Sequence, residues 1–210
     1  MKVWDFPTRL YHWLQAGLFV GLAASGFRGE GPHMYLGLGL FTLILWRIVW
    51  GFVGSETSRF KQFLRSPKGV LRYLLGRLPV TPGHNPAGGW MVVVMISLLL
   101  LQCLSGIVVA GLADNLPLAE LWLTDAVFDI SVMVHGICAR LLPAVVGIHL
   151  FAILVYKLRS KPLVWAMVVG VQKKLSVSTG DVAIASNTRA LLVLVVAGLV
   201  TMAIVALSLM

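Results

Sequence analysis

The chain is poor in charged residues, and acidic residues are the scarcest. Only 12% of its 210 residues are charged, with 8 acids against 17 bases, and 59% are hydrophobic. Soluble domains carry about 25% charged residues, so this composition excludes an ordinary soluble enzyme. Several apolar runs reach the length of about 20 residues that crosses a bilayer, which predicts an integral membrane protein. The basic residues lie in loops beside these runs, which argues against nucleic-acid binding.

Cysteine is also scarce. The chain has 2 cysteines, Cys103 and Cys138, and both lie inside apolar runs. Two cysteines cannot form a disulfide scaffold, and neither belongs to a C-x-x-C-H haem-attachment motif or a zinc pattern. They are therefore interpreted as small buried side chains, and any haem in this protein would not be attached to cysteine.

Five apolar runs are predicted to span the membrane. They cover residues 10–27, 33–52, 88–110, 131–156 and 190–209. The predicted fold class is therefore all-α integral membrane, with a four-helix bundle in residues 1–160, a cytoplasmic linker over 161–188 and a fifth C-terminal transmembrane helix over 189–210. The start of the first run resembles a signal peptide that ends at Ala23-Ala24-Ser25. His12 and three aromatic residues precede that point, so a retained span is the favoured interpretation.

The loops differ strongly in charge. The loop after the second run and the segment before the fifth are basic, whereas residues 111–129 contain acids but no Lys or Arg. The positive-inside rule therefore places the N-terminus in the cytoplasm and the C-terminus in the periplasm, in a bacterial inner membrane. The basic loop repeats apolar residues at helical spacing and is divided by Pro67, so we expect an amphipathic segment at the membrane surface that contacts lipid or a partner. A short interfacial helix is expected in the acidic loop.

Four histidines lie within or at the ends of the predicted spans: His12, His33, His135 and His149. His135 and His149 are fourteen residues apart, so on one helix they lie about 21 Å apart along the axis and face nearly the same side. The charge topology puts His33 and His135 near the outer edge, and His12 and His149 near the inner edge. Each pair comes from two different helices, as the two axial ligands of a six-coordinate haem require. Histidine in a span is costly and usually marks a functional site.

Other interpretations of these histidines were weighed. A proton relay usually involves carboxylates within the membrane, but here every acid lies outside the spans or at their ends. A zinc or copper site needs ligands that converge at one point, whereas these histidines separate to two depths. An ordinary hydrogen-bonded role stays open for each histidine taken alone. His84 has no partner at its own depth, and roles beside a haem propionate, in quinone binding or in the loop stay open for it.

Arginines at or within the ends of the spans are candidate partners of haem propionates. Arg9, Arg47 and Arg140 occupy such positions, where an unpaired guanidinium is costly. Guanidinium groups bind carboxylates through paired hydrogen bonds. By depth, Arg9 and Arg47 are assigned to the inner haem and Arg140 to the outer haem.

The sequence resembles the bacterial cytochrome b-561 and nickel-hydrogenase b-type cytochrome family. The resemblance runs from the first residues to about Lys174 and rests on the His135–His149 pair and four stretches: VWDFPTRLYHWLQAGLF, HMYLGLGLFTLILWRIVWGFVGS, RFKQFLRSPKGVLRYLLG and GHNPAGGWMVVVMISLLLLQCLSG. It implies a helical bundle with two b haems that carries electrons between membrane quinone and a partner redox protein. The family's ligand positions fall on His12, His33, His135 and His149. The chain departs from the pattern at Gly136, where Glu is expected, and at Arg140.

The sequence therefore predicts transmembrane electron transfer through two haem b groups. The electrons would pass between the quinone or quinol pool and a partner, for example a periplasmic c-type cytochrome. The alternatives are a stand-alone superoxide:quinone oxidoreductase with the same ligands and, in a different class, a haem-free transporter or assembly subunit. Membrane lipid is an expected contact, nucleic acid is not, and a homo-oligomer stays open.

Overall fold

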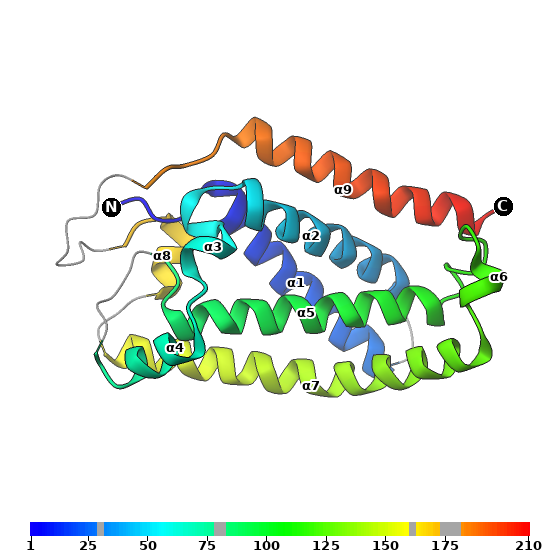
Figure 1. The fold of residues 1–210 in the computed structure, drawn as a ribbon, viewed down its shortest axis with the longest axis horizontal. Coiled ribbons are helices and arrows are strands. Elements are labelled where there is room, and N and C mark those ends of the chain that lie inside the picture. Colours follow the sequence, from blue (N-terminus) through cyan, green and yellow to red (C-terminus); the bar gives the residue numbers. More distant parts are fainter. Residues whose placement is uncertain (29–31, 78–82, 160–162, 173–181) are drawn as a thin grey trace.

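The computed structural model describes residues 1–28, 32–77, 83–159, 163–172 and 182–210, and these residues are almost entirely helical (Figure 1). The long helices are α1 (Phe6–Arg28), α2 (His33–Val53), α5 (Pro86–Val109), α7 (Asp125–Leu158) and α9 (Asn187–Ser208). The short ones are η1 (Glu56–Ser58), α3 (Phe60–Phe63), α4 (Pro67–Leu74), α6 (Ala119–Trp122) and α8 (Leu163–Val169).

The helices α1, α2, α5 and α7 form an antiparallel bundle, and α9 lies outside it (Figure 1). Helix α2 packs against α1, α5 and α9, and α5 packs against α7. The apolar core lies among α2, α5 and α7, where Leu40, Ile44 and Leu99 are almost fully buried. Helix α9 is attached to α2 through polar contacts, since Trp46 Nε1 donates to the Ala190 carbonyl and the hydroxyls of Thr42 and Thr201 lie 2.8 Å apart.

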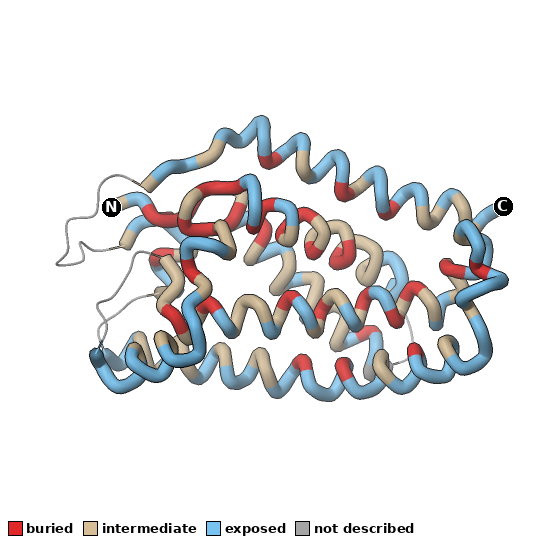
Figure 2. Tube along the Cα trace, viewed as in Figure 1, coloured by how far each residue is buried: buried red, intermediate tan, exposed pale blue. Residues whose placement is uncertain are grey.

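Four helices of the described chain are long and apolar enough to cross a membrane: α2, α5, α7 and α9. They coincide with four of the five predicted spans. Figure 2 shows how much of their surface is exposed, above all along α7 and α9, as expected for helices that face lipid. Helix α1 belongs to the bundle but is not among these four. It carries Arg9, His12 and Gln15, which lower its apolar character, and its role as a span stays a prediction.

Helix boundaries depart from the predicted spans where a polar cap extends the helix. Thr8 N donates to Asp5 Oδ1 at 2.6 Å, and α1 therefore begins four residues before the predicted span. Thr124 caps α7, which begins at Asp125 rather than at residue 131. Hydropathy alone misses such starts because side-chain caps begin a helix within polar sequence.

The short helices lie at the two ends of the bundle. Pro67 is the first residue of α4 and separates it from α3, as predicted, and Ser66 Oγ caps α4 by accepting from Gly69 N at 3.3 Å. Helix α6 is the short helix expected in the acidic loop. The predicted linker over 161–188 contains α8, and the Gly170 carbonyl after α8 accepts hydrogen bonds from Val3 N and Trp4 N. The predicted polar link around 173–181 lies outside the described residues.

A close approach between α3 and α5 leads to a stability prediction. A Cβ atom at Gly89 would lie 2.9 Å from both the Phe63 carbonyl oxygen and Phe63 Cδ2, so α5 can approach α3 only with glycine there. We expect Gly89→Ala to destabilise the protein by about 1–3 kcal/mol, as other overpacked sites do. A lowered thermal midpoint in detergent, measured by circular dichroism, would confirm this. Gly88→Ala is the control, because its nearest contact, Asn85 Oδ1 at 3.4 Å, is ordinary. Equal midpoints for the two variants would contradict the prediction.

Candidate functional site

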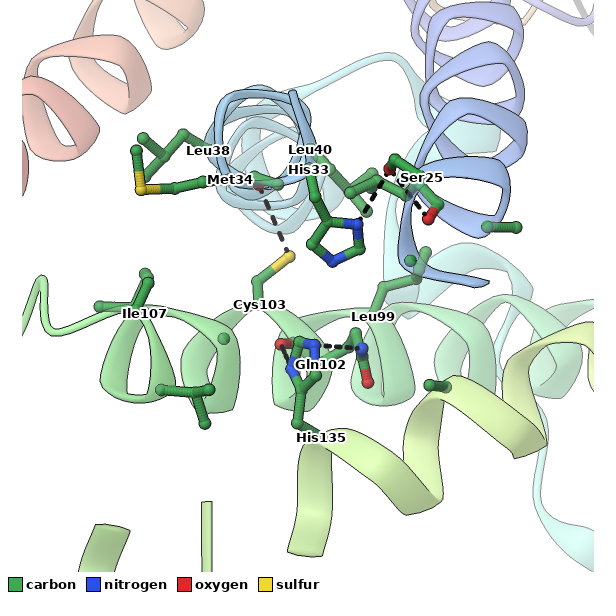
Figure 3. A pocket seen from close by; sticks show the side chains of 18 of the residues that line it. Ser25, His33, Met34, Leu38, Leu40, Leu99, Gln102, Cys103, Ile107 and His135 are labelled. Carbon is green, nitrogen blue, oxygen red and sulfur yellow. Dashed lines mark hydrogen bonds between the residues drawn. The ribbon is translucent and has the colours of Figure 1, made fainter. Parts of the chain in front are cut away.

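His33 and His135 face each other between α2 and α7 (Figure 3). Their ring centroids are 6.3 Å apart and their planes are inclined by 76°. His33 is the first residue of α2, and His135 lies ten residues after the start of α7, which begins on the same side of the bundle. The structure therefore brings together the outer pair that the sequence predicts.

Both rings are held at Nδ1 by groups on neighbouring helices. His33 Nδ1 lies 3.0 Å from Ser25 Oγ on α1. His135 Nδ1 lies 3.1 Å from the Gln102 carbonyl and 3.3 Å from Ser105 Oγ, both on α5. Hydrogen bonding at one ring nitrogen orients the ring and directs the other nitrogen, as is usual for metal-bound histidine. Helices α2 and α7 thus carry the two histidines, and helices α1 and α5 hold the rings in position.

Two glycines make room for these rings. A Cβ atom at Gly26 would lie 3.1 Å from His33 Cε1, and one at Gly106 would lie 3.0 Å from His135 Cε1. Both distances are shorter than ordinary carbon–carbon contacts. Each ring therefore lies directly against a helix backbone, which limits its possible positions.

The Gln102 side chain also contacts His135. Its Nε2 lies 3.0 Å from His135 Nε2, and its Oε1 is buried without a hydrogen-bond partner among the described residues. Coordination of a metal by His135 Nε2 requires this amide to turn away. Gln102 is therefore a polar group next to the ring nitrogen that would coordinate a metal.

The two histidines line a cavity of about 460 Å³ (Figure 3). This volume lies within the range of about 300–1,000 Å³ found for small-molecule and cofactor sites. Apart from the polar groups already described, its lining is mostly apolar and includes Leu22, Leu38, Leu99 and Leu142. The cavity can therefore hold a flat, largely apolar molecule and exclude water from it.

The inner pair, His12 and His149, lies at the opposite end of the bundle. His12 lies near the start of α1 and His149 near the end of α7, and His84 lies in the turn before α5. Burial lowers the pKa of His84 to about 3, helped by the positive charge of Arg47 and by His12 and His149, so His84 is neutral at physiological pH. His84 packs edge-on against Trp4 at 4.7 Å and against Phe63 at 4.7 Å. The structure thus gathers three of the five histidines at this end.

Arg47 lies at the inner end and is only 3% exposed. Its guanidinium carbon lies 5.2 Å from the centre of the Phe60 ring, and its Nη1 is buried with no hydrogen-bond partner in the described part of the chain. A buried guanidinium donor without an acceptor is costly. The guanidinium group of Arg47 is therefore available to bind an anionic group.

The other two predicted arginines lie elsewhere. Arg9 Nη1 donates to the Val168 carbonyl at the end of α8, so this guanidinium binds the backbone of the segment after α7. Arg140 is exposed on α7 and is not part of the cavity lining. The position of Arg140 along the sequence matches the depth predicted for the outer haem. The rotation of α7 about its axis, however, turns the Arg140 side chain away from the cavity. Propionate binding by Arg9 and Arg140 stays a prediction.

Sequence reasoning missed the groups that hold the histidines: Ser25, Gln102 and Ser105. A signal was present, because Gln102, Ser105 and Gly106 follow the i, i+3, i+4 spacing of one helix face within an apolar run. Ser25 lies at the end of the segment that resembles a signal peptide. In the structure its hydroxyl forms a hydrogen bond with His33.

The outer pair fits a b haem. The two ring centres lie 6.3 Å apart, and both rings line the same mostly apolar cavity, so the two imidazoles could hold one haem iron between them. Gly37 lines the cavity, and a Cβ there would meet no described atom within 4 Å, which leaves room for a flat ring. Nowhere among the described residues do three His, Cys, Asp or Glu side chains form a metal-binding group.

The close fit of His135 against Gly106 leads to a second prediction. We expect Gly106→Ala to displace the His135 ring, since the new Cβ would lie 3.0 Å from Cε1. The purified variant should retain about half the haem of the wild type, because only one of two pairs is disturbed. The ratio of haem to protein measures this. Gly136→Ala, next to His135 but with no described atom within 4 Å of the new Cβ, should keep its haem. Unchanged haem content in Gly106→Ala would contradict the assignment.

Comparison with known proteins agrees with this geometry. A family model described as prokaryotic cytochrome b561 matches residues 3–170, which include all four bundle helices and the four span histidines. Searches of curated proteins and of solved structures gave no match. The family consists of membrane b-haem electron-transfer proteins, and the four apolar helices agree with a multi-pass membrane protein. The chain therefore belongs to the prokaryotic cytochrome b561 family.

Proposed function

We propose that this protein carries electrons across the bacterial inner membrane through two b haems, one held by His33 and His135 and the other by His12 and His149. The observation that carries the proposal is the outer pair, whose rings face each other at 6.3 Å across a cavity of about 460 Å³. The inner pair is supported by the position of His12 near the start of α1 and of His149 near the end of α7, which lie at the same end of the bundle. The two pairs lie at opposite ends of one bundle, so together they form two steps of one path.

Bound haem supplies a one-electron iron couple whose potential depends on axial ligands, hydrogen bonds and burial. Residues of this protein would provide the axial ligands, the hydrogen bonds to them and the burial. The hydrogen bonds to the Nδ1 atoms of His33 and His135 orient the ligands and increase their basicity. The leucines of the cavity exclude water, and Arg47 offers a buried guanidinium to a propionate at the inner end.

We further propose that α1 is the fifth membrane span, with the N-terminus in the cytoplasm and the C-terminus in the periplasm. The helix has 23 residues, enough to cross a bilayer core of about 30 Å. It lies antiparallel to α2 within the bundle (Figure 1). The basic loops gather at the end where His12 and His149 lie, and the positive-inside rule makes that end cytoplasmic.

The redox partners are proposed from the surfaces at the two ends. The periplasmic loop and the first turns of α7 expose four acids, which would attract a basic protein such as a c-type cytochrome; they are Asp114, Glu120, Asp125 and Asp129. Quinone or quinol is the proposed exchange partner within the membrane, because it dissolves in the lipid that contacts the exposed apolar faces of the spans.

Removal of a single ligand tests the assignment of the pairs. We expect His149→Ala to lose the inner haem and keep the outer one, and His33→Ala to do the reverse, because the pairs share no ligand. Each variant should therefore contain about one haem per chain instead of two, and the absorption spectra of the two variants should sum to that of the wild type. Survival of both haems in His149→Ala would show that the pairing is wrong. A folded wild-type protein without b-haem absorption would overturn the whole proposal.

Electron exchange with quinol tests the proposed partners. In vesicles, a short-chain quinol should reduce the haems of the wild type, and His149→Ala should block transfer between the two sides of the membrane while the outer haem stays reducible from the outside. Stopped-flow absorption at the haem bands measures both effects. Rapid reduction of the isolated chain by superoxide, with quinone as acceptor and no partner protein, would instead favour the stand-alone oxidoreductase.

A further inference from the structure

Helix α4 has three distinct faces. Gly69, Val70 and Tyr73 are half-buried and face the bundle. Leucines follow the i, i+3, i+4 spacing of a second face and stay exposed, with Leu71 at 58%, Leu74 at 66% and Leu75 at 57%. Leu71 and Leu74 on α4 and Leu75 at its C-terminal cap form an exposed apolar surface, which is unfavourable in water.

The third face of α4 and the residues around it are basic. Lys68 and Arg72 are exposed on the helix, and Arg65 and Arg77 are exposed just before and after it. Over residues 55–77 the single acid is Glu56, whose Oε2 accepts a hydrogen bond from Ala183 N. No acid of α4 itself balances this charge. The surface is therefore both apolar and positively charged, which suits an anionic bilayer surface.

Helix α4 lies level with the start of α5, at the depth of a membrane interface. Trp90, in the first turns of α5, is 41% exposed, and its Nε1 donates to the Arg65 carbonyl at 2.9 Å. Exposed tryptophan at the end of a span is typical of the boundary between lipid and water. This bond ties the segment before α4 to that boundary.

A hydrogen-bonded group fixes the inward face of α4. The hydroxyls of Tyr73 and Tyr156 lie 2.9 Å apart, and Asn85 Nδ2 donates to Tyr156 at 2.9 Å. Tyr156 lies near the end of α7, and Asn85 caps α5. The leucine face is therefore held in one orientation relative to the spans and is not free to turn inward.

We propose that α4 is an interfacial helix that binds anionic phospholipids of the cytoplasmic leaflet, with Leu71, Leu74 and Leu75 among the acyl chains and Arg65, Lys68, Arg72 and Arg77 at the headgroups. Charge complementarity and the level of Trp90 favour a lipid surface over a cytoplasmic protein as the occupant. The proposal is independent of haem ligation and of the direction of electron flow.

Lipid selectivity tests the basic face. The haem-loaded full-length protein is placed in phosphatidylcholine vesicles that contain a trace of spin-labelled phosphatidylglycerol or spin-labelled phosphatidylcholine, and the immobilised fraction of each is measured. We expect a preference of at least about threefold for phosphatidylglycerol, which falls to near one at high salt or in Lys68→Gln/Arg72→Gln. The control Lys2→Gln/Arg189→Gln removes the same charge from two exposed side chains, near the N-terminus and at the start of α9, and should keep the preference. An equal loss in both double variants, or no preference in the wild type, would overturn the proposal.

The depth of the leucine face is tested separately. Cys103 and Cys138, both buried and free, are replaced by Ala, and a nitroxide is attached at Leu74→Cys or at Lys68→Cys in vesicles that contain phosphatidylglycerol. We expect the label at 74 to collide with oxygen, as within lipid, and the label at 68 with a water-soluble nickel chelate. The haem absorption spectrum verifies that each labelled protein is folded. A label at 74 that is open to the nickel chelate would show that this face stands in water, where a protein could cover it, and would exclude the lipid assignment.

Discussion

The outer site depends on a hydrogen bond at the far side of each histidine ring. Imidazole has two polar nitrogens, and in a membrane interior there is no water to partner the one that does not bind metal. Ser25 on α1 partners His33 on α2, while Ser105 and the Gln102 carbonyl on α5 partner His135 on α7. Four helices therefore contribute to the placement of these two rings, and their antiparallel order brings the contributing residues to one end of the bundle.

The two ends of the bundle are built differently. The outer end holds an apolar cavity, and the inner end carries a stack of aromatic side chains from α1 and α2. Tyr11, Trp46 and Trp50 stack with ring centroids 5.2–5.3 Å apart, and Trp50 Nε1 donates to Thr8 Oγ1 at 3.2 Å. The N-terminal residues bind the carbonyl of Gly170. The N-terminal residues and the segment after α8, which lie outside the four bundle helices, are thus bound to each other at this end.

Much of the architecture was accessible from the sequence because a membrane imposes simple rules. Run length and hydropathy located the four apolar helices, and Pro67 correctly divided the surface segment into α3 and α4. The fourteen-residue spacing and the charge of the loops together predicted that His33 would pair with His135, and in the structure the centres of these two rings lie 6.3 Å apart. Prediction was weaker for α1, whose polar side chains reduce the hydropathy signal, and for the start of α7, which Thr124 sets through a cap.

The sequence by itself determined which residues share an end of the bundle, because that follows from their positions along helices that alternate in direction. It could not determine rotation about each helix axis or the approach of one helix to another. Arg47 and Arg140 show the difference: both are arginines within spans, yet one is buried beside the inner histidines and the other is exposed on α7. Gly26 and Gly106 became part of the site only when α1 and α5 packed against the rings of His33 and His135. Packing between helices decided these matters, since side-chain volume across the interface, not position along the chain, sets how helices turn toward one another.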